Sequence, residues 1–186
     1  RGILREPVSG IARSDLFVLT RCNDNSNNSL KRLGEMAPEK PVFKSFHEPY
    51  VCGIFNGTDD ETVGRFSGTV FRNCDFLKKY KVFVFSGIAK NGDFQLTMEH
   101  LAEEVLGAIG FKDHHQYTES DFRLIIAKAQ KASAAFLVTT EKDYVKIAGK
   151  MKSPLNIVVV GIRVSFKQDE MKFSEFIKDQ VDHIVQ

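Results

Sequence analysis

Three unbroken apolar runs, each followed by a helix-length segment, constrain the fold of this chain more than any other feature. Residues 81–86, 135–139 and 156–164 lack the alternation of apolar and polar side chains seen in a half-exposed strand. Runs of this kind are typical of strands buried on both faces of a parallel sheet. Because strand and helix alternate from Lys81 onward, we expect a parallel α/β sheet in this part of the chain.

Helical periodicity accompanies these strands. A helix is predicted from Asp93, because the apolar side chains after it follow helical spacing. These side chains are Phe94, Met98, Leu101, Val105 and Ile109. The segment between this helix and Asp113 is short enough to remove an edge strand from the sheet.

Two helix starts carry capping chemistry. Thr118 and Asp121 are three residues apart and approximate a capping box, and Thr140 and Asp143 repeat the pattern after the strand at 135–139. A last helix is predicted over residues 170–185, with Phe173, Phe176, Ile177 and Val181 facing inward.

The N-terminal part has a different character. Residues 15–20 form a further apolar strand after a short helical piece around Ile11, and the Asn/Ser tract at 22–29 reads as a surface loop or hinge. Extended pieces are predicted at 42–47 and 50–56, and a strand pair across 62–71. We therefore expect three parts: residues 1–40 from a different sheet, a β-rich linker over 41–75, and a C-terminal α/β domain over 76–186.

Composition excludes several classes of protein. The 186 residues carry a net charge of only +2 without a Lys/Arg cluster, so we expect no nucleic-acid partner. Three scattered cysteines make neither a disulfide framework nor a zinc motif, which fits a reducing cytoplasm. No run approaches the roughly 20 apolar residues of a membrane span. The first residue is Arg rather than Met, and we expect the chain to be a fragment of a longer protein.

One candidate site is the Asp113-His114-His115 triplet. A histidine in such a place is often only a surface or packing residue. Asp-His-His is also found in manganese phosphoesterases, where the triplet binds metal and further Asp-rich motifs complete two metal sites. This chain has Asp15 and an Asp59-Asp60 pair but no D-x-D after a strand, so the phosphoesterase remains a minor alternative.

A second candidate site lies at 139–143, where a buried strand gives way to a helix. Helix capping alone would explain Thr140 and Asp143. Capping does not explain why Thr139, Glu141 and Lys142 crowd the same strand end, where a lysine could neutralise a phosphate at the helix N-terminus. The glycine loop at 87–92 has similar geometry but matches neither dinucleotide-binding nor Walker A patterns, so the chain alone lacks the usual cradle for ATP phosphates.

The ordered set of motifs resembles one family, the tetraacyldisaccharide 4′-kinases of lipid A biosynthesis, over nearly the whole chain. The motifs are Leu4-Arg5-Glu6-Pro7, Ala12-Arg13-Ser14-Asp15, Val84-Phe85-Ser86-Gly87-Ile88, Asp113-His114-His115-x-Tyr117-Thr118 and Thr139-Thr140-Glu141-Lys142-Asp143-x-Val145-Lys146. Each motif alone is weakly specific, and their order carries the resemblance.

The resemblance implies a two-domain kinase of which this chain is one part. Family members join an N-terminal P-loop domain, which holds Walker A and the catalytic aspartate, to a smaller C-terminal α/β domain through a β-stranded linker. They use ATP and Mg²⁺ to phosphorylate the 4′-hydroxyl of a lipid-linked glucosamine disaccharide 1-phosphate at the cytoplasmic face of the bacterial inner membrane. The chain then corresponds to the tail of the P-loop domain plus the C-terminal domain, with peripheral membrane contact, and would be inactive without the missing N-terminal P-loop domain.

The resemblance also implies roles for individual residues. Glu6 would help organise the Mg²⁺ region, and Arg5 would lie near phosphate or substrate. His114 matches the family's active-site histidine, which approaches the catalytic aspartate of the other domain and could orient it as a base, with Asp113 fixing the ring. The family motif at the cleft matches Thr139, Thr140, Glu141, Lys142 and Asp143, of which Thr139, Thr140 and Lys142 are expected to contact the nucleotide or position the substrate.

The sequence departs from the family pattern after Ile88. The usual family stretch there is G-N-P-x-x-F, whereas this chain has Ala89-Lys90-Asn91-Gly92-Asp93-Phe94. This departure, the short segment before Asp113 and the Asn-rich loop change the local cleft. A non-catalytic α/β module that binds a lipid or a protein partner is therefore the main alternative to a kinase.

Overall fold

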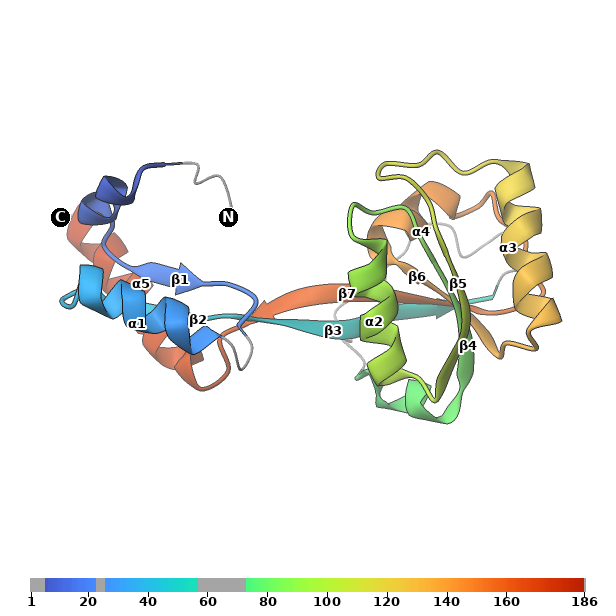
Figure 1. Ribbon diagram of the computed structural model, residues 1–186, viewed down its shortest axis with the longest axis horizontal. Helices are drawn as coiled ribbons and strands as arrows, with labels where there is room; N and C mark the ends of the chain where they lie inside the picture. The colour runs from blue at the N-terminus through green and yellow to red at the C-terminus, as the bar shows by residue number, and fades with distance from the viewer. Residues whose placement is uncertain (1–5, 23–25, 57–72, 186) are drawn as a thin grey trace. The chain divides into compact units, whose positions relative to one another are not determined.

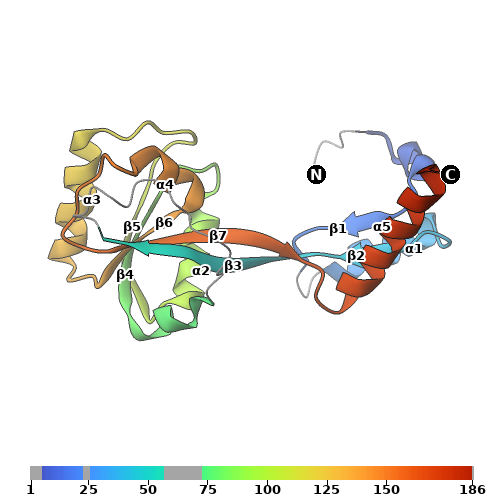
Figure 2. The same ribbon diagram turned by 180° about the vertical axis from the view of Figure 1, so that it is seen from behind.

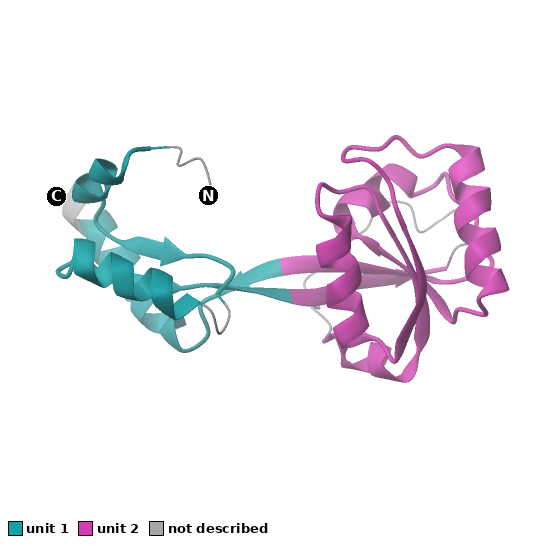
Figure 3. Cartoon of the chain, in the orientation of Figure 1, with its two compact units in different colours: residues 1–48, 163–186 teal, residues 49–162 magenta. Residues whose placement is uncertain are grey.

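The computed structural model describes residues 6–22, 26–56 and 73–185 and divides into two compact units. Unit 1 comprises residues 1–48 and 163–186, and unit 2 comprises residues 49–162 (Figure 3). These units differ from the expected ranges 1–40, 41–75 and 76–186, because the last helix groups with the N-terminal segment rather than with the domain that precedes it in sequence.

A five-stranded sheet in the order β3-β7-β6-β4-β5 organises the larger part of the structure (Figure 1). Its strands are β3 (Phe46–Phe55), β4 (Lys81–Ser86), β5 (Glu104–Gly110), β6 (Phe136–Thr140) and β7 (Ile157–Ser165). Parallel pairing joins β4 to β5, β4 to β6 and β6 to β7, which confirms the predicted parallel sheet. β5 and β3 are the two edge strands of this sheet, and Figure 2 shows β3 beside β7.

The apolar runs are unbroken because helices cover the sheet on both faces. Side chains alternate along each strand, so Phe83 and Phe85 face one layer and Val82 and Val84 the other. The phenylalanine face packs against α3 (Glu119–Lys131) and α4 (Glu141–Ile147), and the valine face packs against α2 (Asn91–Leu101) and the 3-10 helix Cys74–Lys79. Unit 2 is thus a three-layer α/β/α domain.

The prediction for residues 93–109 was wrong in two respects. The helix begins at Asn91 and ends at Leu101, whereas Val105 and Ile109 lie on β5, which is the edge strand expected to be lost. A spacing of four residues fits one face of a helix and also one face of a strand, so these two positions could not distinguish the two structures.

Unit 1 contains a small parallel sheet of β1 (Phe17–Leu19) and β2 (Val42–Lys44). The helices α1 (Asn27–Met36) and α5 (Glu170–Val185) and the 3-10 helix Val8–Arg13 belong to the same unit. Phe43 is buried on β2, and the rings of Phe173 and Phe176 from α5 lie 5.2 Å and 6.0 Å from it. These two residues face inward as predicted, whereas Ile177 and Val181, which were also predicted to face inward, are exposed.

The polar tract at 22–29 is only partly a loop, because α1 already begins at Asn27, and its Leu30 and Leu33 are the partly buried residues of a short amphipathic helix. The strand pair predicted across 62–71 lies outside the described residues.

Candidate functional site

Three parallel strands of unit 2 end at the same edge of the sheet, and the polar motifs follow those ends. β4 ends at Ser86, β5 at Gly110 and β6 at Thr140. The amide of Phe111 donates to the Ser86 carbonyl at 2.8 Å and so ties the loops after β4 and β5 together. Carboxyl ends of parallel strands are where α/β proteins place their binding sites.

Asn91 organises the loop after β4. Its Oδ1 accepts from the Ser86 hydroxyl at 2.6 Å and from the amide of Ile88 at 3.3 Å, while its Nδ2 donates to the Phe111 carbonyl at 2.6 Å. One amide side chain therefore joins the ends of β4 and β5. Sequence reasoning placed Asn91 only in a departing stretch and missed this role, which an amide at the first turn of a helix could have indicated.

Asp143 is the most deeply buried charged residue at this edge. Its Oδ2 accepts from the Gly87 amide at 2.9 Å and from the Thr140 hydroxyl at 2.7 Å, and its Oδ1 accepts from the Lys146 ammonium at 3.1 Å. The side chain is completely buried, whereas that of Lys146 is 23% exposed. A buried carboxylate is tolerated because these donors replace water.

The carboxylate of Asp143 takes the donors that a phosphate would need at the end of β6. Thr140 donates to Asp143 and accepts from its backbone amide at 3.1 Å, so its hydroxyl serves as a helix cap. The Thr139 side chain is buried, and its hydroxyl has no hydrogen-bond partner among the described residues. Lys142 is exposed, so it is the member of this predicted trio whose side chain reaches solvent.

The loop at 111–118 carries the predicted catalytic residues Asp113 and His114. His114 has a left-handed backbone, with φ of 59°, and its side chain is 90% exposed. Asp113 accepts from the His114 amide at 3.1 Å, and its Oδ2 lies 3.8 Å from the His114 Nε2. Asp113 therefore bonds the backbone of His114 and leaves the imidazole open to solvent.

The neighbouring His115 is held inside the loop. Its ring stacks on Phe111 at 4.5 Å and meets Tyr117 edge-on at 5.1 Å, and its Nε2 lies 3.0 Å from the Asp121 carboxylate. Asp121 completes the predicted capping box with Thr118, which is confirmed. Burial by itself raises the pKa of Asp121, but hydrogen bonds from Thr118 and His115 outweigh it and hold the pKa below its usual range.

Tyr117 links this loop to the Asp143 network. Its hydroxyl is buried and has no hydrogen-bond partner within the described part of the chain. Burial and the nearby Asp143 carboxylate raise the pKa of Tyr117 far above that of an exposed tyrosine, so the phenol stays neutral. Lys146 lies 6.0 Å from the centre of its ring.

Two further predicted site residues belong to the N-terminal segment. Arg5 is outside the described residues, and Glu6 belongs to unit 1, where its carboxylate is exposed and pairs with Arg13 at 2.7 Å. Within residues 6–22, 26–56 and 73–185, no three His, Cys, Asp or Glu side chains are grouped so that they could hold a metal ion.

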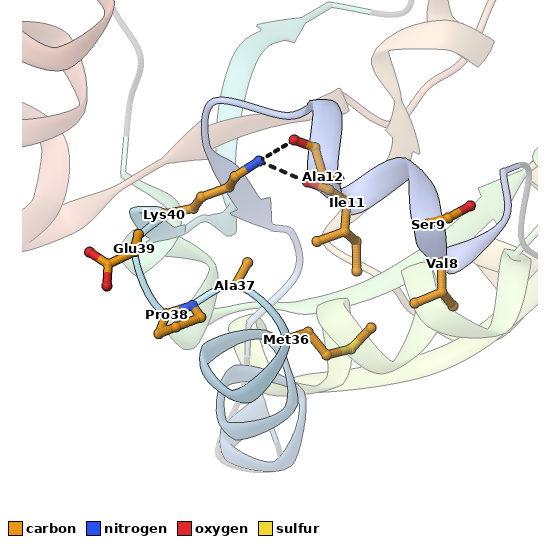
Figure 4. Close-up of a pocket in the computed structure, with 9 residues that line it drawn as sticks. All are labelled: Val8, Ser9, Ile11, Ala12, Met36, Ala37, Pro38, Glu39 and Lys40. Carbon is orange, nitrogen blue, oxygen red and sulfur yellow. Dashed lines mark hydrogen bonds between the residues drawn. The ribbon is translucent and has the colours of Figure 1, made fainter.

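A hollow of about 390 Å³ lies in unit 1 between the 3-10 helix Val8–Arg13 and the end of α1 (Figure 4). Lys40 is the cation in its lining, and its ammonium donates to the carbonyls of Ile11, Ala12 and Ser14. An ammonium has three hydrogens to donate, so these carbonyls already engage its donors. The hollow thus offers apolar walls but no cation for a phosphate.

Fold and site together define a three-layer α/β domain whose polar loops cluster at the carboxyl edge of a parallel sheet. The model for the family described as tetraacyldisaccharide-1-P 4′-kinase matches residues 1–182. A tetraacyldisaccharide 4′-kinase of Desulfatibacillum aliphaticivorans is 34% identical over 184 residues, which cover 97% of this chain and 47% of the relative. The enzyme of that name from Bdellovibrio bacteriovorus is 34% identical over 147 residues, which cover 78% of this chain and 40% of the relative.

A solved structure agrees with these matches. The crystal structure of "apo" form LpxK from Aquifex aeolicus in complex with ATP superimposes with a TM-score of 0.53 at 26% identity, covering 95% of this chain and 45% of that one. The chain belongs to the tetraacyldisaccharide 4′-kinase family, and it spans about half the length of the relatives it matches. Among the described residues, no helix is long and apolar enough to cross a membrane.

Proposed function

We propose that this chain is the C-terminal part of a kinase that transfers the ATP γ-phosphate to the 4′-hydroxyl of a tetraacyldisaccharide 1-phosphate. The match of the family model to residues 1–182 carries the proposal. The relatives are about twice as long, so the P-loop and the catalytic aspartate are assigned to sequence outside this chain. On this proposal the 186 residues alone do not catalyse transfer.

His114 is proposed as the catalytic contribution of this chain. Its imidazole is exposed, its backbone is held in a conformation that non-glycine residues seldom adopt, and it belongs to a loop that packs through His115 instead. An imidazole placed beside a carboxylate base can orient that base toward the sugar hydroxyl as phosphoryl transfer begins. Asp113 bonds the His114 amide, so its proposed role is to hold this backbone.

ATP and Mg²⁺ are the proposed cofactors of the whole kinase. Mg²⁺ would supply charge neutralisation at the phosphates, and the described residues offer no group of three His, Cys, Asp or Glu side chains to hold it. Lys142 and Arg5 are the proposed phosphate contacts, and Glu6 would supply a single carboxylate to the metal region. Thr139 and Thr140 shape the strand end, because one is buried and the other caps α4.

The lipid-linked disaccharide is the proposed substrate, met at the cytoplasmic face of the bacterial inner membrane by peripheral contact. A binding-only module is the remaining alternative, since it would keep this fold and lose catalysis. The family match favours the kinase over the manganese phosphoesterase.

The direct test is ATP-dependent phosphorylation of the disaccharide 1-phosphate lipid. The protein extended upstream to the length of its relatives is compared with the 186-residue chain. Activity in the extended protein alone supports the proposal. Inactivity of both would favour a binding module, and activity of the short chain would refute the assignment of the P-loop to sequence outside it.

A further inference from the structure

We propose that Gly87 and Asp143 are positioning residues that fix the loop bearing His114. The inference rests on the proposed function, because it gives the position of His114 a catalytic meaning. Neither residue touches the reacting groups on this view. Each acts through the 111–118 loop.

The 111–118 loop packs closely against Gly87. A β-carbon added at this glycine would lie 3.2 Å from the His115 β-carbon, 3.3 Å from the Lys112 carbonyl oxygen and 3.2 Å from Asp143 Oδ1. Contacts this short require the neighbours to move by a few tenths of an ångström. Gly87 has no positive φ, so the need for glycine here comes from the close approach of the loop rather than from backbone strain.

Asp143 holds the Gly87 backbone in place. Its bond to the Gly87 amide joins the end of β4 to α4, and Thr140 and Lys146 fix the carboxylate in turn. The bond is buried, so water cannot easily replace it. The position of Gly87, and of the loop packed against it, therefore depends on a carboxylate that contributes no chemistry of its own.

Internal contacts hold the loop around His114. The amide of His115 donates to the Lys112 carbonyl at 3.1 Å, and the His115 ring stacks on Phe111 and meets Tyr117 edge-on. A shift at His115 must therefore pass to His114, its direct neighbour. A misplacement of 1 Å can lower a rate about a hundredfold, so a few tenths of an ångström should lower kcat roughly three- to tenfold.

The test uses Gly87→Ala in the extended kinase, with Gly92→Ala as the matched control. Gly92 lies in the first turn of α2, and a β-carbon there would meet no atom within 4 Å. We expect Gly87→Ala to lower kcat three- to tenfold with KM for ATP unchanged, and Gly92→Ala to leave both unchanged. Equal kcat values in the two variants would overturn the positioning role.

A double substitution separates positioning from general damage. If Gly87 acts through His114, Gly87→Ala should lower kcat no further in a protein that already carries His114→Ala. An additional loss of the same size would show that the effect reaches catalysis by another route and would refute the proposal.

Asp143→Asn tests the bond between the Asp143 carboxylate and the Gly87 amide, with Asp75→Asn as its control. Asp75 pairs with Lys78 at 2.8 Å, the same spacing of three residues as Asp143 and Lys146, but on the surface. Amide exchange of residues 112–117 is measured alongside activity. We expect faster exchange in Gly87→Ala and Asp143→Asn only, and unchanged exchange in both would overturn the inference even if the unsubstituted kinase proved inactive.

Discussion

Replacing Thr140 by alanine should destabilise the protein more than the loss of an ordinary helix cap. Two interactions disappear: the cap to the Asp143 amide and the hydrogen bond to the buried Asp143 carboxylate at 2.7 Å. A cap contributes about 1 kcal/mol, and a bond to a buried charged group about 1.5–3 kcal/mol. We therefore expect Thr140→Ala to lower the free energy of unfolding by about 3 kcal/mol.

Thr118 provides a matched control for this prediction. It caps α3 through the same pair of bonds to an aspartate three residues on, Asp121, but on the exposed side of the helix start. Water can replace the exposed hydroxyl, so Thr118→Ala should cost about 1 kcal/mol.

Urea and thermal unfolding of both variants measure the difference. At about 2–4 °C per kcal/mol for a chain of this size, Tm should fall roughly 6–12 °C for Thr140→Ala and 2–4 °C for Thr118→Ala. Thr140→Ser keeps the hydroxyl and should restore most of the loss. Equal losses at the two threonines would refute the argument that burial of the Asp143 carboxylate sets the magnitude.

Three further results are expected. In the extended kinase, His114→Ala should lower kcat far more than it raises KM, and steady-state kinetics with an unchanged kcat would exclude the proposed role. The folded protein holds the pKa of Asp121 below its usual range, so the ionised carboxylate stabilises the fold above about pH 4, and this contribution is lost as the pH falls through the folded pKa. Asp121→Asn should therefore reduce the fall in the free energy of unfolding on the acid side. Curves of unfolding free energy that stay parallel below about pH 4 would contradict this. Burial raises the pKa of Cys52 to about 11, which leaves roughly one thiolate in a thousand at pH 8, so iodoacetamide labelling followed by mass spectrometry should be slow at pH 8 and faster at pH 10.

The features that local chemistry determines were predictable from the sequence. The parallel strands at 81–86, 135–139 and 156–164 follow from apolar runs without alternation, and the caps at Thr118 and Thr140 follow from hydroxyl and carboxylate side chains three residues apart. These patterns depend on neighbours in sequence, and so a single chain reveals them.

The features that depend on distant contacts were not predictable. Val105 and Ile109 fit a helix and a strand equally well, and only pairing with β4 makes them part of β5. The roles of Asn91 and Gly87 depend on loops 20 or more residues later in the chain. The grouping of α5 with the N-terminal segment likewise rests on contacts such as those between Phe43 and Phe173.

The Thr139–Asp143 motif shows why residue types alone do not identify a phosphate site. Threonine hydroxyls, a strand end, a helix start and lysines would suit a phosphate, but the same groups suit an internal carboxylate equally well. In this domain Asp143 supplies that carboxylate and holds the Gly87 amide, the Thr140 hydroxyl and the Lys146 ammonium together. A phosphate at the same point would have to displace a completely buried charge from all three donors, and the two anions would repel each other at short range. The buried part of the motif therefore acts on catalysis, in our proposal, by holding the His114 loop in position, and the exposed Lys142 is the member left for the proposed phosphate contact.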